Sequence, residues 1–224
     1  MTVRTKSLLP GNIIPLTTDF LFANFFNDEN NIDILENFLS CYLKVPLEKL
    51  KGKVKLQNRK PPIHHKQNRS IEVDLLVDID GKKINIELSN SLTKGMSARN
   101  ITYACNIHGR QLKYGDNDYS NIKKTLQIQL NNFHCNEEDM IESYYFTSKK
   151  GKVLTEMIQI DIVDMELASK MCYTSRDEKL IRWINIFRAK TMKELKEWIG
   201  DDLMEISAAQ KFVEEMSKYS KDEE

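Results

Sequence analysis

The spacing of apolar residues changes along the chain and predicts a β-sheet with helices before, between and after its strands. Helical spacing occurs over residues 17–26 and 30–43, where Thr17 and Thr18 supply a start signal. From residue 71 the period becomes two. Further strands are predicted over residues 125–130 and 142–163, the latter broken near Lys150 and Gly151. Helical patterns fill residues 95–114 and 165–224. This order predicts an α/β or α+β fold, with a mixed central sheet flanked by helices.

The segment IEVDLLVDIDGKKINIELS, residues 71–89, predicts a β-hairpin around Asp80 and Gly81. Asp-Gly is a preferred pair for a two-residue type I′ turn. With that turn Ile79 faces Lys82, so the numbers of opposing residues sum to 161. One face then carries only apolar pairs: Val73 with Leu88, Leu75 with Ile86, and Val77 with Ile84. The other face pairs Asp78 with Lys83, Leu76 with Asn85, Asp74 with Glu87, and Glu72 with Ser89.

The pairing of Asp74 with Glu87 places two carboxylates opposite each other, where like charges destabilise a hairpin. Two structural explanations are open: solvent screens the pair, or a nearby cation such as Lys83 balances it. A functional explanation is that the balancing cation is Mg²⁺, which takes oxygen ligands and is often held by one or two carboxylates. Such an ion activates water and stabilises charge on a phosphodiester as it is cleaved.

The ordered set of residues around this hairpin resembles the recombination-promoting nuclease (Rpn) or PD-(D/E)XK nuclease family of transposase-like proteins. The resemblance spans residues 15–170 and rests on the following positions: Asp19, Phe20 and Phe22; Asp74; GKKINIE ending at Glu87; Arg99 and Tyr103; Gln111, Leu112, Gly115 and Tyr119; and the segment from Glu166 to Lys170. It implies a restriction-endonuclease-like core over residues 1–170, followed by a helical extension over residues 171–224. It also implies a metal-dependent endonuclease that hydrolyses DNA phosphodiester bonds with Mg²⁺ or Mn²⁺.

Family roles carry over to individual positions of this chain. Asp74 and Glu87 match the metal-binding acids, and Asp19 matches the acid of the N-terminal helix. Ser89 occupies the last position of the catalytic motif. The resemblance also places Arg99, Tyr103 and Gln111 near the substrate. Open alternatives are a surface arginine for Arg99, a tyrosine at the rim of the core for Tyr103, and a capping or packing role for Gln111. Lys94 is not part of the resemblance; it is a candidate phosphate contact that would compensate for the missing charge at Ser89.

Ser89 departs from the family pattern, which has Gln or Lys at this position. Serine can orient a water molecule, but it is shorter and carries no charge. The alternative hypothesis is therefore a catalytically weakened or inactive nuclease fold that binds DNA or a protein partner.

Composition narrows the setting without deciding the activity. The chain has 224 residues, with 33 Lys and Arg against 33 Asp and Glu, which excludes an evenly basic nucleic-acid coat protein. Residues 44–69 nevertheless hold nine basic residues and one acid, a candidate DNA contact or a solvated loop. Four dispersed cysteines, no signal-like apolar run and no membrane-length apolar stretch predict a cytoplasmic protein without membrane contact. The amphipathic C-terminal helices either close the domain or form a homo-oligomer.

Overall fold

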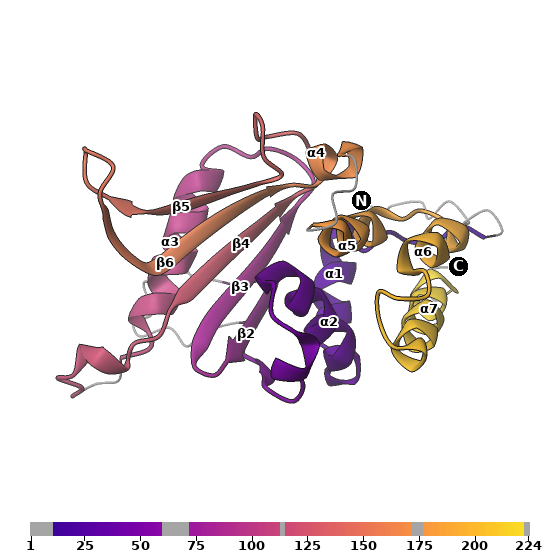
Figure 1. The fold of residues 1–224 in the computed structure, drawn as a ribbon, viewed down its shortest axis with the longest axis horizontal. Coiled ribbons are helices and arrows are strands. Elements are labelled where there is room, and N and C mark those ends of the chain that lie inside the picture. The colour runs from indigo at the N-terminus through magenta and orange to yellow at the C-terminus, as the bar shows by residue number, and fades with distance from the viewer. Residues whose placement is uncertain (1–10, 60–71, 113–114, 172–176, 222–224) are drawn as a thin grey trace, which may run out of the picture. The chain divides into compact units, whose positions relative to one another are not determined.

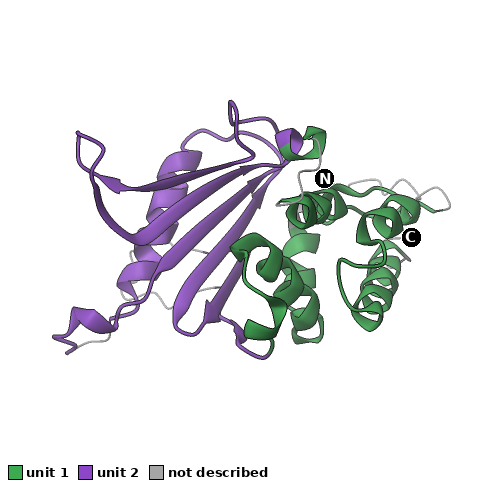
Figure 2. Cartoon of the chain, in the orientation of Figure 1, with its two compact units in different colours: residues 1–51, 168–224 green, residues 52–167 purple. Residues whose placement is uncertain are grey.

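The computed structural model describes residues 11–59, 72–112, 115–171 and 177–221. The chain divides into two compact units, one formed by residues 52–167 and the other by residues 1–51 together with 168–224 (Figure 2). The predicted division at residue 170 stays a prediction. The second unit boundary lies close to it, but the first 51 residues group with the C-terminal helices.

A six-stranded mixed sheet forms the unit of residues 52–167 (Figure 1). Its strands are β1 (Val54–Leu56), β2 (Leu75–Ile79), β3 (Lys82–Ser89), β4 (Thr125–Asn131), β5 (Ile141–Thr147) and β6 (Val153–Asp164). They stand in the order β1-β2-β3-β4-β6-β5, with β3, β4 and β6 parallel and the other pairs antiparallel. A mixed sheet with flanking helices confirms the predicted fold class.

The β2–β3 hairpin has the predicted register. Leu75 pairs with Ile86 and Ile79 pairs with Lys82, so the sum of 161 holds through the ladder. Asp80 and Gly81 have φ values of 51° and 87°, as a type I′ turn requires. The predicted pairing of Val73 with Leu88 is wrong, because the ladder starts only at Leu75. Val73 packs with Leu76 and Ile107 instead. The chain bends at Asp74, which breaks the alternation of faces there.

The helix α3 (Met96–Gly109) links β3 to β4 and lies across one face of the sheet (Figure 1). In β4, the sequence TLQIQLN alternates apolar residues with Thr, Gln and Asn, yet every one of its seven residues is buried. Thr125, Gln127, Gln129 and Asn131 pair in register with β3 residues Lys83, Asn85, Glu87 and Ser89. The face beneath α3 is therefore polar near β3 and β4, although it is shielded from water.

The other unit is helical and is held together by aromatic residues. Its helices are α1 (Asp19–Phe26), α2 (Ile32–Leu43), α5 (Glu178–Arg188), α6 (Met192–Ile199), α7 (Ile206–Lys221) and the second half of α4 (Met165–Lys170), with 3₁₀ turns at Glu29–Asn31 and Leu47–Lys49. The third 3₁₀ turn, Tyr119–Asn121, belongs to the sheet unit. In the described ranges, no helix is both long and apolar enough to cross a membrane.

Aromatic rings from distant parts of the chain meet in this helical core. The ring centroids of Phe38 and Phe187 are 5.0 Å apart, and those of Phe25 and Phe212 are 5.2 Å apart. The indole N–H of Trp183 donates to Asn37 Oδ1 at 3.0 Å. The C-terminal helices thus close the domain that the N-terminal helices begin. Their second predicted role, homo-oligomerisation, stays a prediction.

Candidate active site

Asp74 and Glu87 meet where the β2–β3 ladder gives way to side-chain hydrogen bonds. The backbone N–H of Asp74 donates to Glu87 Oε1 at 3.2 Å, and the N–H of Leu88 donates to Asp74 Oδ2 at 3.0 Å. Each carboxylate therefore accepts a hydrogen bond from the opposite strand. These two bonds replace the regular ladder and hold both acids at the end of the hairpin away from its turn.

The surroundings of Glu87 disfavour its negative charge. Its side chain is only 4% exposed, and burial, followed by the neighbouring charge of Asp74, raises the pKa of Glu87 from 4.5 to about 8. The amide of Asn85 opposes this shift by donating to Glu87 Oε1 at 3.1 Å, and the charge of Arg99 opposes it as well. The acid pair is thus short of positive charge, which a cation bound there would supply.

Ser89 lies in a hydrogen-bond network with Arg99 and Gln129. Arg99 Nη2 donates to Ser89 Oγ at 3.0 Å, and the amide of Gln129 donates to the same hydroxyl at 3.1 Å. Gln129 Oε1 is 3.5 Å from Arg99 Nη2. Because Gln129 pairs with Glu87 across the β3–β4 ladder, this network adjoins the acid pair.

A family model for PD-(D/E)XK nuclease family transposases matches residues 16–224. The chain belongs to this family. Comparison with curated proteins and with solved structures finds no match. Membership in this PD-(D/E)XK family supports a nuclease-type function. The matched range includes the C-terminal helices as well as the sheet.

In this PD-(D/E)XK chain, the arrangement of the two carboxylates suits a small divalent cation. Both hydrogen bonds to Glu87 reach Oε1, so among described groups Oε2 has no hydrogen-bond partner and is available as a ligand. Nowhere in the described ranges do three His, Cys, Asp or Glu side chains converge as a metal cage. Two carboxylates with water and substrate oxygens completing the shell are typical of Mg²⁺ rather than of Zn²⁺.

The amide residues beneath α3 are part of the site that sequence reasoning missed. Asn85 Nδ2 donates to Gln127 Oε1 at 2.7 Å as well as to Glu87, so β4 supports the acid from the side. Gln129 supports Arg99 and Ser89 in the same way. The alternation Gln-Ile-Gln in a buried strand was the available signal, because buried amides must find partners.

The remaining predicted site residues lie in different places. Tyr103 packs against the cluster of Val73, Leu76 and Ile107, and Lys94 is exposed before α3. Gln111 exchanges hydrogen bonds with the backbone of Lys123, next to the end of β4 that pairs with Lys83, and its place near the substrate stays a prediction. Asp19 begins α1, but its side chain lies outside the described part of the structure.

The adjacent residues His134 and Cys135 both interact with Asp164, at the end of β6. His134 Nδ1 lies 2.8 Å from Asp164 Oδ2, which also accepts the backbone N–H groups of Cys135 and Asn136. Burial alone would raise the pKa of Asp164, but backbone N–H donors, led by that of Leu167, lower it. The carboxylate therefore fastens the loop after β4 to the start of α4.

Proposed function

We propose that this chain is a metal-dependent DNA endonuclease that hydrolyses phosphodiester bonds in the cytoplasm. The observation that carries the proposal is the meeting of Asp74 and Glu87 at the end of the hairpin, with Arg99 close enough to affect the charge of Glu87. Two adjacent carboxylates can hold a cation, and a nearby guanidinium can bind a phosphate. Together they suit a reaction that brings a cation and a phosphate into contact.

In this proposal each residue has a defined task. Asp74 and Glu87 would hold Mg²⁺ or Mn²⁺, which supplies Lewis acidity and a more acidic bound water. Arg99 contacts the scissile phosphate, where a guanidinium can donate two parallel hydrogen bonds. Ser89 and Gln129 fix the orientation of that guanidinium. Lys94 and the basic segment of residues 44–69 would hold more distant phosphates; residues 60–69 of this segment lie outside the described residues.

Metal dependence provides the direct test of the proposal. Purified protein should nick supercoiled plasmid DNA in Mg²⁺ or Mn²⁺ and lose this activity in EDTA, because the acid pair alone cannot neutralise a phosphate. Conversion of supercoiled to open-circular DNA on agarose gels measures the activity. Nicking that continues unchanged in EDTA would contradict the assignment.

Gln129 can supply the amide that the family motif has at the position of Ser89. Removing this amide should therefore lower the rate of cleavage. The family position is Gln or Lys, whereas here a Gln amide approaches from β4 and reaches the Ser89 hydroxyl. Gln129→Leu should lower kcat about tenfold to a hundredfold, the usual cost of losing a residue that orients a metal-site group. The affinity for Mn²⁺, measured by calorimetry, should stay unchanged, because the amide of Gln129 is hydrogen-bonded to Ser89 and Arg99 rather than to the carboxylates.

The matched control for this prediction is Gln127→Leu. Gln127 lies on the same face of β4, and its amide oxygen accepts from Asn85 rather than from Arg99. We expect its kcat to fall less than that of Gln129→Leu. Equal kcat for Gln129→Leu and wild type would remove Gln129 from the site.

A second function, binding of DNA or a protein partner without cleavage, is favoured by one observation. With its pKa raised to about 8, Glu87 holds its proton at neutral pH when no metal is bound. If the protein never binds metal, Glu87 stays protonated at neutral pH and cannot serve as a metal ligand. Calorimetry that detects no Mg²⁺ or Mn²⁺ binding to the wild-type protein would support this second function over the first.

A further inference from the structure

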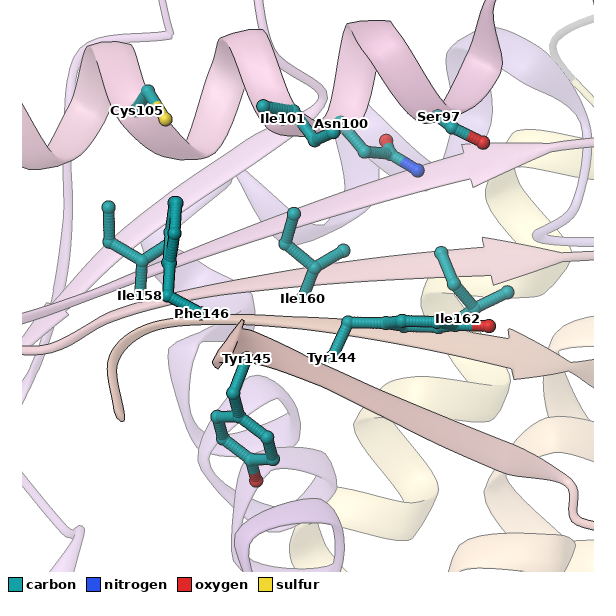
Figure 3. Close-up of a pocket in the computed structure, with 10 residues that line it drawn as sticks. All are labelled: Ser97, Asn100, Ile101, Cys105, Tyr144, Tyr145, Phe146, Ile158, Ile160 and Ile162. Carbon is teal, nitrogen blue, oxygen red and sulfur yellow. The ribbon is translucent and has the colours of Figure 1, made fainter. Parts of the chain in front are cut away.

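An apolar pocket of about 350 Å³ lies between α3 and the strands β5 and β6, apart from the acid pair (Figure 3). Its floor consists of Ile158, Ile160 and Ile162 on β6. Ser97, Asn100, Ile101 and Cys105 line it from α3, and Tyr144 and Phe146 line it from β5. A cavity of this size is at the lower end of the range for small-molecule sites, so it fits one compact group.

Asn100 is the polar feature that identifies what the pocket takes. Asn100 is 1% exposed, and within the described part of the chain neither its amide nitrogen nor its amide oxygen has a hydrogen-bond partner. Figure 3 shows this amide directed from α3 toward the strands. Leaving a buried donor and acceptor unpaired is costly, so a ligand that presents an acceptor beside a donor would satisfy both atoms at once.

Aromatic rings and positive charge restrict the ligand further. The hydroxyl of Tyr144 donates to Glu142 at 2.5 Å, which ties down the phenol and leaves its ring as an apolar surface. The turn between β5 and β6 carries Lys149, Lys150 and Lys152, all exposed. Residues 147–155 contain no acid, so this turn is complementary to a phosphate chain.

We propose that this pocket takes one unstacked nucleobase of a DNA strand. The apolar walls and Tyr144 would contact the faces of the base, the Asn100 amide would pair with its edge, and the lysine turn would contact adjacent phosphates. Asparagine reads adenine in this way through one donor and one acceptor, and extruded bases are commonly held by stacking together with edge hydrogen bonds. The proposal rests on the proposed function only for its substrate class, since it requires DNA but not cleavage.

Alkylation of Cys105 tests the pocket in the wild-type protein. Cys105 is exposed and lines the pocket, whereas Cys135 is also exposed but lies outside it. N-ethylmaleimide is added in EDTA with or without a saturating single-stranded oligonucleotide, and each cysteine is followed by peptide mass spectrometry. We expect the strand to slow alkylation of Cys105 about tenfold and to leave Cys135 unchanged.

A strand of equal length and charge that lacks bases is the critical control. It should leave Cys105 as reactive as in the free protein, because phosphates alone do not fill the pocket. Binding of both strands is checked by fluorescence anisotropy. If the base-containing strand binds but Cys105 stays equally reactive, the pocket assignment is wrong while the nuclease proposal stands. If neither strand binds, the pocket assignment also fails, and plasmid nicking in Mg²⁺ or Mn²⁺ tests the nuclease proposal independently.

A pair of variants separates base recognition from folding. Asn100→Leu should abolish the protection of Cys105 and raise the thermal midpoint, because an apolar side chain replaces an unpaired amide. Asn106, on the same helix, also has a buried amide oxygen with no hydrogen-bond partner among the described residues, but it does not line the pocket. Asn106→Leu should therefore keep the protection. Full protection in Asn100→Leu would overturn the assigned role of the amide.

Discussion

Asp74→Asn and Glu87→Gln should each reduce plasmid nicking at least about a thousandfold, the scale expected when charge stabilisation is removed from a transition state. Both substitutions keep the size of the side chain, and the remaining amide oxygen can still accept the hydrogen bonds that now reach the carboxylate. What they remove is the negative charge that would hold the cation. The loss should therefore appear in cleavage and in Mn²⁺ binding together.

Asp78→Asn is the matched control for the acid pair. Asp78 is a carboxylate on the same hairpin, but it pairs with Lys83 at 2.6 Å and does not contact Glu87. This variant should nick DNA at the wild-type rate and bind Mn²⁺ with wild-type affinity by calorimetry. Equal nicking by wild type and Asp74→Asn, or equal loss in all three variants, would contradict the assignment of the metal site.

The acid pair could be predicted from sequence because it depends on local structure. A two-residue Asp-Gly turn fixes the register of the hairpin, and register alone decides which side chains face each other. Asp74 and Glu87 are only 13 residues apart, and the strands between them are joined directly. The bend at Asp74 was not predictable in this way, because Val73 leaves the ladder to pack against Ile107 from α3.

The other half of the site depends on contacts between distant segments. Ser89 and Gln129 are 40 residues apart, and they meet because β3 and β4 pair in parallel with α3 as the crossover. No turn motif specifies that register. The contact between Gln129 and Arg99 therefore could not be predicted from the local sequence. The same limit applies to the helical unit, where Phe25 meets Phe212 only in the folded chain.

Metal-free wild-type protein should lose stability as the pH rises from about 4.5 to 8, and Glu87→Gln should not. The folded state keeps the Glu87 proton up to about pH 8, whereas the unfolded chain releases it near 4.5. Between these values the folded state binds more protons than the unfolded state, so the free energy of unfolding falls with pH. The total effect is on the order of 5 kcal/mol. Urea denaturation in EDTA at several pH values measures it.

Two comparisons make this pH dependence specific to Glu87. Asp78 shifts in the opposite direction, because hydrogen bonds from Lys83 and Gly81 outweigh burial and lower its pKa; Asp78→Asn should therefore keep the wild-type fall in stability above pH 4.5. Mn²⁺ at pH 8 should restore the stability of the wild type, since a cation that binds only the folded state stabilises it, and should leave Glu87→Gln unchanged. A wild-type stability that stays level from pH 4.5 to 8 in EDTA would show that Glu87 is ionised without metal, and the charge deficit that we assign to the acid pair would then be absent.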